Sequence, residues 1–524
     1  MLRDLRIWEC PELKSFIYES SEENSNTTVP SLFNKNFICF PKLENLDLNE
    51  CHVKKIWDDE FLASSTSFCC LKKLDVYACK FLKCVVSSST AASFNQLESL
   101  EVRGCEAMEL IVRRDERMDK MSFPKLSLLT LWNLPRLSKF SSGIFSEFPM
   151  LWELDIQNCP ELKTFISESF EEKANTTMPS LFNENFICFP KLEKLRLVGC
   201  LVKKIWDDEF LASSTSFCCL KKLDVDDCKF LKCVVSSSMA ASFKQLEDLK
   251  VTKCEAMELI VRKDERMDKM SFPKLSLLSL GNLPRLSKFS SGIFSEFPML
   301  CDLYIRNCPE LKTFISESFE EKANTTMPSL FSENVALPSL KTVWVEGVDG
   351  LKMIWQYGRL SNNAESFCQL EDVKVEKCKN LMGIFSSGMH TRLGNLKWLK
   401  ISECEMVEEI FEMETSNCGI EEVAGKQEGL ETVVSPDDEF VFPQLREMEL
   451  QSLPNLVSFY AGRHTLSFPL LEELEVIECL KVKAFSGSEL LSYQGRHESL
   501  FSTIFSTKVR LSFFNHIDSS RLRS

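Results

Sequence analysis

The sequence has little histidine and no long apolar stretch, and both absences limit what the protein can do. Five histidines occur among 524 residues, and none lies near cysteines at the spacing of a zinc site, so we predict no bound metal. No apolar run reaches the roughly 18 residues of a membrane-spanning helix. The first ten residues, MLRDLRIWEC, are charged throughout, so we expect neither a signal peptide nor a membrane partner.

Basic side chains are also in deficit. The chain has 77 acidic and 62 basic residues, and the resulting net charge of −15 opposes general binding to nucleic acid or anionic lipid. We therefore predict that neither nucleic acid nor membrane is a partner.

Cysteine, in contrast, is abundant, and twelve of the 23 cysteines recur at one position of an internal repeat. A cysteine that returns once per repeat indicates a small packed side chain with a weak S–H donor, not half of a disulfide. Reduced thiols without an export signal predict a cytoplasmic or nuclear protein that is not secreted. The twelve are Cys10, Cys51, Cys79, Cys105, Cys159, Cys200, Cys228, Cys254, Cys308, Cys378, Cys404 and Cys479.

The repeat follows the pattern LxxLxLxxC, as in LENLDLNEC and LEELEVIEC. Its centre alternates with period two, as a strand with one buried face does, and such a strand needs neighbours beside it. We predict the α/β class, as a leucine-rich-repeat solenoid of about 16 repeats with a curved parallel β-sheet on its concave face. The sixteen copies begin at Leu2, Leu43, Leu71, Leu97, Leu126, Leu151, Leu192, Leu220, Leu246, Leu275, Leu300, Leu340, Leu370, Leu396, Leu445 and Leu471.

A longer period lies over the short one. Residues 10–158 recur as 159–307, and a third partial copy runs from Cys308 to about Asn334. We assign residues 1–486 to one solenoid, interrupted by an acidic insertion at about 412–440 that we interpret as a solvated loop. Residues 487–524 lack the repeat and are predicted to form a disordered tail.

The two copies of the block differ at 27 of 149 positions, and sixteen differences fall at the 25 variable positions of the five strand motifs. A recognition face that has diversified predicts this distribution, although relaxed drift of exposed positions remains an alternative. Trp, Tyr and Arg commonly dominate interface energies. The predicted protein-binding residues are Asn45, Asp47, Asn49, Glu50, Tyr77, Glu101, Arg103, Trp132, Trp152, Asp155, Lys194, Arg196, Asp226, Asp227, Lys250, Lys253, Tyr304 and Arg306.

The irregular repeat resembles the leucine-rich-repeat region of plant intracellular nucleotide-binding disease resistance proteins of the coiled-coil type. The phrases FPKLENLDLNEC and FPQLREMELQSLPNL and the ending CPELKTF carry the resemblance, which covers about residues 1–486. It implies an innate immune module for plant defense that binds a pathogen effector, a guarded host protein, or a nucleotide-binding domain in cis or trans. The chain has no G-x-x-x-x-G-K-[ST] phosphate loop, so we expect a fragment without the nucleotide-binding switch.

Other classes are less consistent with the residues. A substrate-recognition repeat domain of an F-box-type ubiquitin ligase adaptor is the alternative, but its F-box and more regular repeats are not evident. An extracellular receptor would need a signal peptide and paired-cysteine caps. No nucleophile-elbow motif occurs. We predict no enzymatic activity, no catalytic residues and no cofactor.

Overall fold

The computed structural model describes most of the solenoid, and the chain divides into two compact units. Unit 1 is Met1–Leu275 with Asn282–Pro284, and unit 2 is Ser276–Gly281 with Arg285–Ser524. The described residues are 2–16, 30–33, 40–58, 68–114, 120–142, 145–167, 179–183, 187–207, 216–264, 269–291, 294–316, 329–331, 335–355, 366–412, 440–460, 466–482, 484–486 and 510–512.

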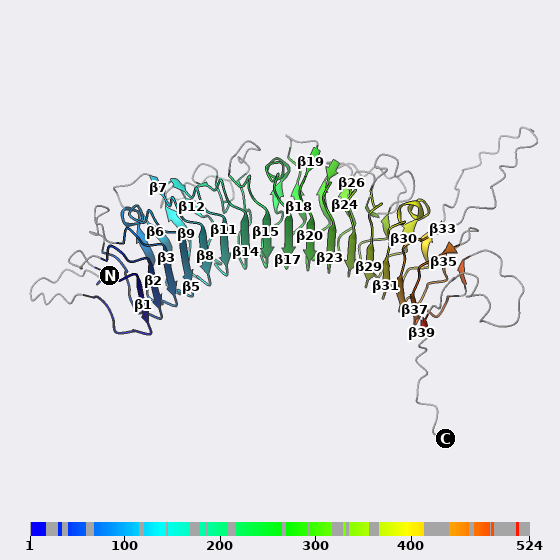
Figure 1. Ribbon diagram of the computed structural model, residues 1–524, viewed down its shortest axis with the longest axis horizontal. Helices are drawn as coiled ribbons and strands as arrows, with labels where there is room; N and C mark the ends of the chain where they lie inside the picture. Colours follow the sequence, from blue (N-terminus) through cyan, green and yellow to red (C-terminus); the bar gives the residue numbers. More distant parts are fainter. Residues whose placement is uncertain are drawn as a thin grey trace, which may run out of the picture. The chain divides into compact units, whose positions relative to one another are not determined.

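Unit 1 contains a parallel sheet with one five-residue strand per repeat (Figure 1). Neighbouring strands pair without any shift, so that residues at the same motif position lie side by side. The strands are β1 (Asp4–Trp8), β2 (Asn45–Asn49), β3 (Lys73–Tyr77), β5 (Ser99–Arg103), β8 (Leu128–Trp132), β11 (Glu153–Gln157), β14 (Lys194–Val198), β15 (Lys222–Asp226) and β17 (Asp248–Thr252).

Unit 2 has a parallel sheet of the same kind. Its strands are β20 (Leu277–Gly281), β23 (Asp302–Arg306), β27 (Thr342–Glu346), β29 (Asp372–Glu376), β31 (Trp398–Ser402), β34 (Glu447–Gln451), β37 (Glu473–Ile477) and β39 (Arg510–Ser512). Strand β39 pairs parallel to β37 although its residues belong to the predicted tail. The rest of that tail, and the acidic insertion apart from its two ends, lie outside the described residues.

Every one of the sixteen predicted motifs forms a strand, and the strand always spans the third to the seventh motif position. The side chains alternate as predicted. In β14, for example, Leu195 and Leu197 are buried while Lys194, Arg196 and Val198 reach the surface. The leucine-rich-repeat solenoid predicted from the sequence is therefore confirmed.

The return segments form shorter parallel strands, and the helical part of the fold is small. In unit 1 they are β4 (Cys84–Ser87), β6 (Leu110–Arg113), β7 (Lys120–Ser122), β9 (Lys139–Ser142), β10 (Phe145–Glu147), β12 (Ile166–Ser167), β13 (Ile187–Cys188), β16 (Val235–Ser236), β18 (Leu259–Arg262) and β19 (Lys269–Ser271). In unit 2 they are β21 (Lys288–Ser291), β22 (Phe294–Glu296), β24 (Thr313–Ser316), β25 (Ser329–Phe331), β26 (Val335–Ala336), β28 (Met353–Trp355), β30 (Gly383–Ser386), β32 (Glu409–Glu412), β33 (Phe440–Val441), β35 (Ser458–Tyr460), β36 (Leu466–Ser467) and β38 (Ala484–Ser486). The helices of the described residues are α1 (Ser88–Ala91), α2 (Ser237–Ala240) and η1 (Ser387–Arg392).

Phenylalanine fills the layer behind the leucines. In unit 1, Phe140 is fully buried, and its ring centroid lies 4.8 Å from that of Phe165 and 5.6 Å from that of Phe148. Aromatic pairs at such separations add to the free energy gained by burying their area. Several of these rings stand in the Phe-Pro pairs that precede strands, where proline prevents the return segment from continuing as a helix.

The recurring cysteines pack as small buried side chains, as predicted. Ten of the twelve are buried, and Cys10 and Cys479 are half-buried. In several repeats the thiol also reaches the sixth-position carbonyl of the preceding repeat, as Cys51 Sγ does to the oxygen of Ile7 at 3.3 Å. Burial raises the pKa of Cys159 to about 12, which keeps this thiol protonated at neutral pH.

The residue at the eighth motif position, just before the recurring cysteine position, ends each strand in a left-handed turn. All sixteen residues at the eighth motif position have φ between 50° and 66°, although only Gly104, Gly199 and Gly347 among them are glycine. The turn aims the backbone N–H at the next repeat, as Gly104 N donates to the carbonyl of Trp132 at 2.9 Å. Non-glycine residues adopt this conformation at a cost of about 1 kcal/mol each.

This turn predicts opposite effects for two reciprocal substitutions at one position of the duplicated block. Gly104→Lys should lower the free energy of unfolding by about 1 kcal/mol, because a Cβ at Gly104 meets its nearest atoms only at 3.7 Å, which leaves strain as the main effect. Lys253→Gly should raise it by less, since the exposed Lys253–Asp226 ion pair of 3.4 Å is lost. Urea denaturation measures the free energy of unfolding of both variants. If the two substitutions changed it in the same direction, strain at the left-handed turn would not be the main effect.

The structure extends the block period further than the sequence comparison did. Trp206 lies 6.0 Å from Phe217 at an interplanar angle of 87°, and Trp355 lies 5.7 Å from Phe367 at 89°. Trp206 and Trp355 are 149 residues apart, which is the length of the duplicated block. Sequence identity alone traces the third copy of the block only to about Asn334. The five-repeat block therefore recurs a third time, with the motifs from Leu340 onward.

Candidate functional site

We define the strand face of each unit as the side chains at the third, fifth and seventh motif positions. Fourteen of the eighteen predicted binding residues lie on it, and Glu50, Trp152, Asp227 and Lys253 flank it at the second or eighth position. None of the eighteen is buried. The register brings together those on adjacent strands, so the predicted residues form continuous surfaces within each unit.

In the first block the strand face is organised around Asp75, a residue that the sequence comparison missed because it does not differ between the copies. The Arg103 guanidinium donates to both Asp75 carboxylate oxygens, at 2.7 and 2.9 Å. Lys73 Nζ lies 3.0 Å from Glu101, and the Arg103 guanidinium carbon lies 6.0 Å from the Tyr77 ring. Both hydrogen bonds come from one nitrogen, Nη2, and hold the Arg103 side chain against Asp75.

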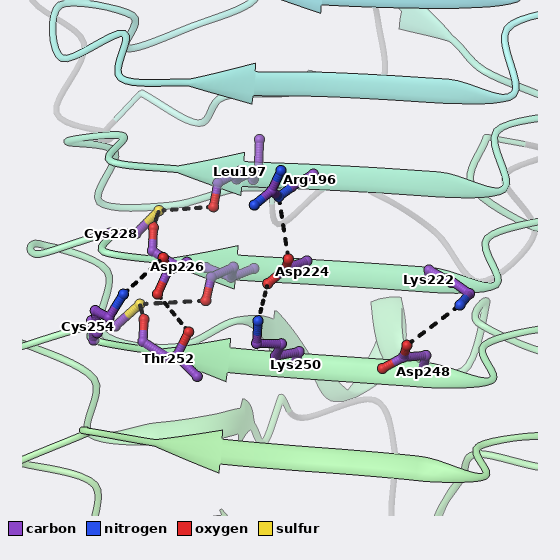
Figure 2. Close-up of polar contacts among 12 residues, drawn as sticks. Arg196, Leu197, Lys222, Asp224, Asp226, Cys228, Asp248, Lys250, Thr252 and Cys254 are labelled. Atoms are coloured by element: carbon purple, nitrogen blue, oxygen red, sulfur yellow. Dashed lines mark hydrogen bonds and ion pairs between the residues drawn. The ribbon is translucent and has the colours of Figure 1, made fainter. Parts of the chain in front are cut away.

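In the second block the equivalent residue, Asp224, has different neighbours (Figure 2). Arg196 approaches one side at 3.4 Å and Lys250 the other at 4.0 Å. Thr252 donates to Asp226 at 2.6 Å, at the positions that Arg103 and Tyr77 occupy in the first block. The central aspartate is thus retained while the residues around it change together.

These changes preserve local pairing and alter the charge. The 25 variable motif positions of the first block carry eight acidic and three basic residues, a net charge of −5, whereas those of the second carry seven of each. Asp47 and Glu101 become Arg196 and Lys250, but each aspartate between them keeps cationic partners. The two blocks therefore present surfaces of different charge on the same scaffold.

Unit 2 carries an aromatic cluster on its strand face, of which the sequence analysis identified only half. Tyr304 and Arg306 on β23 were predicted, whereas Trp344 on β27 and Lys374 on β29 lie beyond the compared blocks. The Arg306 guanidinium carbon lies 3.4 Å from the Trp344 ring centroid, and Lys374 Nζ lies 3.9 Å from it. The motif register alone would have identified both, because each occupies the fifth position.

Exposed aromatics also mark the strand face and its rim in unit 1. Trp132 and Trp152 are each 38% exposed and Tyr77 is 37% exposed, and Lys194 Nζ lies 4.6 Å from the Trp152 ring. Burial raises the pKa of Asp155, although a hydrogen bond from Gln157 at 2.8 Å opposes the shift. Partly buried polar and aromatic groups of this kind favour protein recognition.

Two other kinds of site, a metal site and a membrane-spanning helix, are not evident among the described residues. No group of three or more His, Cys, Asp or Glu residues within them could hold a metal ion. None of their helices has the length and apolar character needed to cross a bilayer.

One parallel strand per repeat on a spine of buried leucines defines a leucine-rich-repeat protein. The repeats of plant disease resistance proteins, described as RPS2-like, match residues 42–176, 191–327 and 339–488. The chain belongs to this family. Each matched segment begins one residue before the first motif of a five-repeat block, so the family unit and the block coincide.

Individual relatives are distant. An Arabidopsis thaliana protein provisionally named a disease resistance protein is 26% identical over 396 residues, which are 69% of this chain and 29% of that protein. A leucine rich cell surface protein from Faecalibacterium prausnitzii is 12% identical, with 78% of this chain and 89% of that one covered and a TM-score of 0.19. The plant peptide hormone receptor RGFR1, in a structure with RGF2, is also 12% identical; the match covers 86% of this chain and 71% of that one, with a TM-score of 0.18. Such TM-scores support no argument.

Proposed function

We propose that the chain is the recognition module of a plant innate immune receptor and binds a pathogen effector or a guarded host protein through its strand faces. It acts without enzymatic chemistry, in the cytoplasm or nucleus, and a nucleotide-binding domain is a further partner in cis or trans. Membership of the disease-resistance repeat family supports the immune role. The F-box alternative has no comparable support.

One observation carries the binding proposal. Strand-face residues differ between the duplicated blocks in groups that contact one another, while the leucines beneath them do not change. Random drift of exposed positions predicts single changes without compensation. Coordinated changes of charge on a constant scaffold are what altered partner specificity requires.

The test exchanges the sixteen differing motif residues of 43–158 with those of 192–307 in the full chain. Proteins captured from plant extract by the original and exchanged chains are then quantified by mass spectrometry. We expect the captured set to change, because the exchange moves a net charge of five units along the surface. Partners bound through one block alone should bind at least tenfold less.

The matched control exchanges the eleven differing residues outside the motifs of the same two blocks. These residues lie outside the strand motifs in the sequence, and exchanging them should leave the captured set unchanged. If the captured set followed this control exchange and ignored the strand-face exchange, recognition through the strand faces would be refuted.

A further inference from the structure

The aromatic cluster of unit 2 holds an arginine in a fixed orientation without a carboxylate partner. A guanidinium carbon 3.4 Å from a ring centroid requires Arg306 to lie flat on Trp344. This stacking leaves the N–H donors of Arg306 pointing outward from its edge. Arg103 and Arg196 on the face of unit 1 differ, because each already pairs with an aspartate.

Two glutamates on the strands beside Arg306 pair with lysines instead. Glu346 lies opposite Arg306 in the strand register but pairs with Lys377 at 3.0 Å. Glu376 pairs with Lys374 at 2.9 Å. Both glutamates thus have cationic partners, and no salt bridge among the described residues reaches Arg306.

Two donors within the cluster also lack acceptors. Arg306 Nε and Trp344 Nε1 are shielded from solvent and have no hydrogen-bond partner in the described structure. Unsatisfied buried donors cost free energy in the unbound protein. The terminal Nη atoms of Arg306 are not among these shielded atoms, so their N–H donors are available to a ligand.

The charge and shape of the cluster select the ligand. A planar guanidinium without an ion-pair partner can donate two parallel hydrogen bonds to one carboxylate. Asp302 and Asp372 act on Tyr304, whose pKa is raised by burial and by these two carboxylates. Their negative charge disfavours a doubly charged phosphate more than a carboxylate.

From these contacts we infer that Tyr304, Arg306, Trp344 and Lys374 form a binding site for an Asp or Glu side chain of a partner protein. The rings of Tyr304 and Trp344, 6.1 Å apart, provide apolar area beside the carboxylate. The inference deepens the proposed function and rests on it, since it names the partner chemistry recognised by one part of the strand face.

The test selects 12-residue peptides from a random display library on the full chain and measures their affinities by fluorescence anisotropy. We expect enriched peptides to share an Asp or Glu whose replacement by Asn or Gln weakens binding at least tenfold. Tyr304→Asp with Arg306→Gln, the residues of the first block at these positions, should abolish binding. Trp344→Ala should weaken it about tenfold, and Arg306→Lys should retain only part of it because Lys lacks the planar donor pair.

A gain-of-binding experiment transfers the aromatic cluster from unit 2 to unit 1. Asp155→Tyr, Gln157→Arg, Arg196→Trp and Asp224→Lys together rebuild the cluster on β11, β14 and β15, and we expect the Arg306-deficient chain carrying it to bind the selected peptides again. The same register places these four positions on adjacent strands. Circular dichroism and urea denaturation establish that each variant is folded.

Several results would overturn the inference. These are failure to enrich any peptide, enrichment of peptides without acidic residues, equal binding by the Arg306→Gln variant, or tighter binding of a phosphoserine peptide than of its Glu counterpart. If the strand-face exchange alters protein capture while Arg306→Gln alone changes no binding, the proposed function stands and this site fails. If the exchange of the two blocks has no effect, the proposed function itself fails.

Discussion

Replacement of Phe140 by alanine is expected to lower the free energy of unfolding of unit 1 by about 3–5 kcal/mol. Phe140 is fully buried and contacts Phe123, Phe148 and Phe165 in the layer behind the leucines, so truncation removes apolar burial and leaves a cavity. Phe123 and Phe165 belong to the two adjacent repeats, which cannot move inward without disturbing the strand ladder.

The loss should be local, because a repeat in a solenoid contacts only its neighbours. Hydrogen exchange followed by peptide mass spectrometry should show weakened protection in the repeats around Phe140 and unchanged protection at the equivalent Phe289 in unit 2. Phe289→Ala should give the reverse pattern. Phe230→Ala is the control, since Phe230 is 51% exposed and should cost less than about 1 kcal/mol. A uniform loss of protection along the chain would contradict the local model.

The second large effect is expected at Leu197. Leu197→Lys places an ammonium group at a site with 0% exposure, where no carboxylate replaces its hydration, and should cost at least about 4 kcal/mol. The carbonyl of Leu197 also accepts the Cys228 thiol at 3.8 Å. We expect local unfolding of the repeats around β14, detected by denaturation and by alkylation of Cys200 and Cys228, which are buried in the native fold.

Val198→Lys is the matched control one residue away. Val198 occupies the outward seventh position, and its first-block counterpart is the polar Asn49. The lysine should reach solvent and change stability by less than about 1 kcal/mol. Similar losses in the two variants would show that the strand does not separate buried from exposed positions by alternation.

The charge contrast between the duplicated blocks has a functional consequence beyond the test of partner choice. Exposed pairs such as Arg196–Asp224 contribute little to stability, so the strand face can change charge without loss of fold. Stability resides in the leucines, the phenylalanines and the buried cysteines. A strand face separated in this way from its supporting core can change its residues while the fold is kept.

The leucine period determined the fold from the sequence alone. A strand whose fourth and sixth motif positions are apolar can bury only one face, and identical spacing forces neighbouring strands into one register. For the same reason the sequence placed all eighteen predicted residues at the surface. The roles of the recurring cysteines followed from their single fixed position.

Tertiary structure alone decided which side chains contact across strands. Asp75 was overlooked because it is identical in both blocks, yet it is the residue to which Arg103 binds. The left-handed turn at residues such as Glu50 and Lys253 had no glycine to mark it. Trp344 and Arg306 are 38 positions apart in the sequence, and only the pairing of β23 with β27 stacks one on the other. Local patterns fix which face a residue occupies, whereas contacts between side chains of different repeats arise only when their strands lie side by side in the folded sheet.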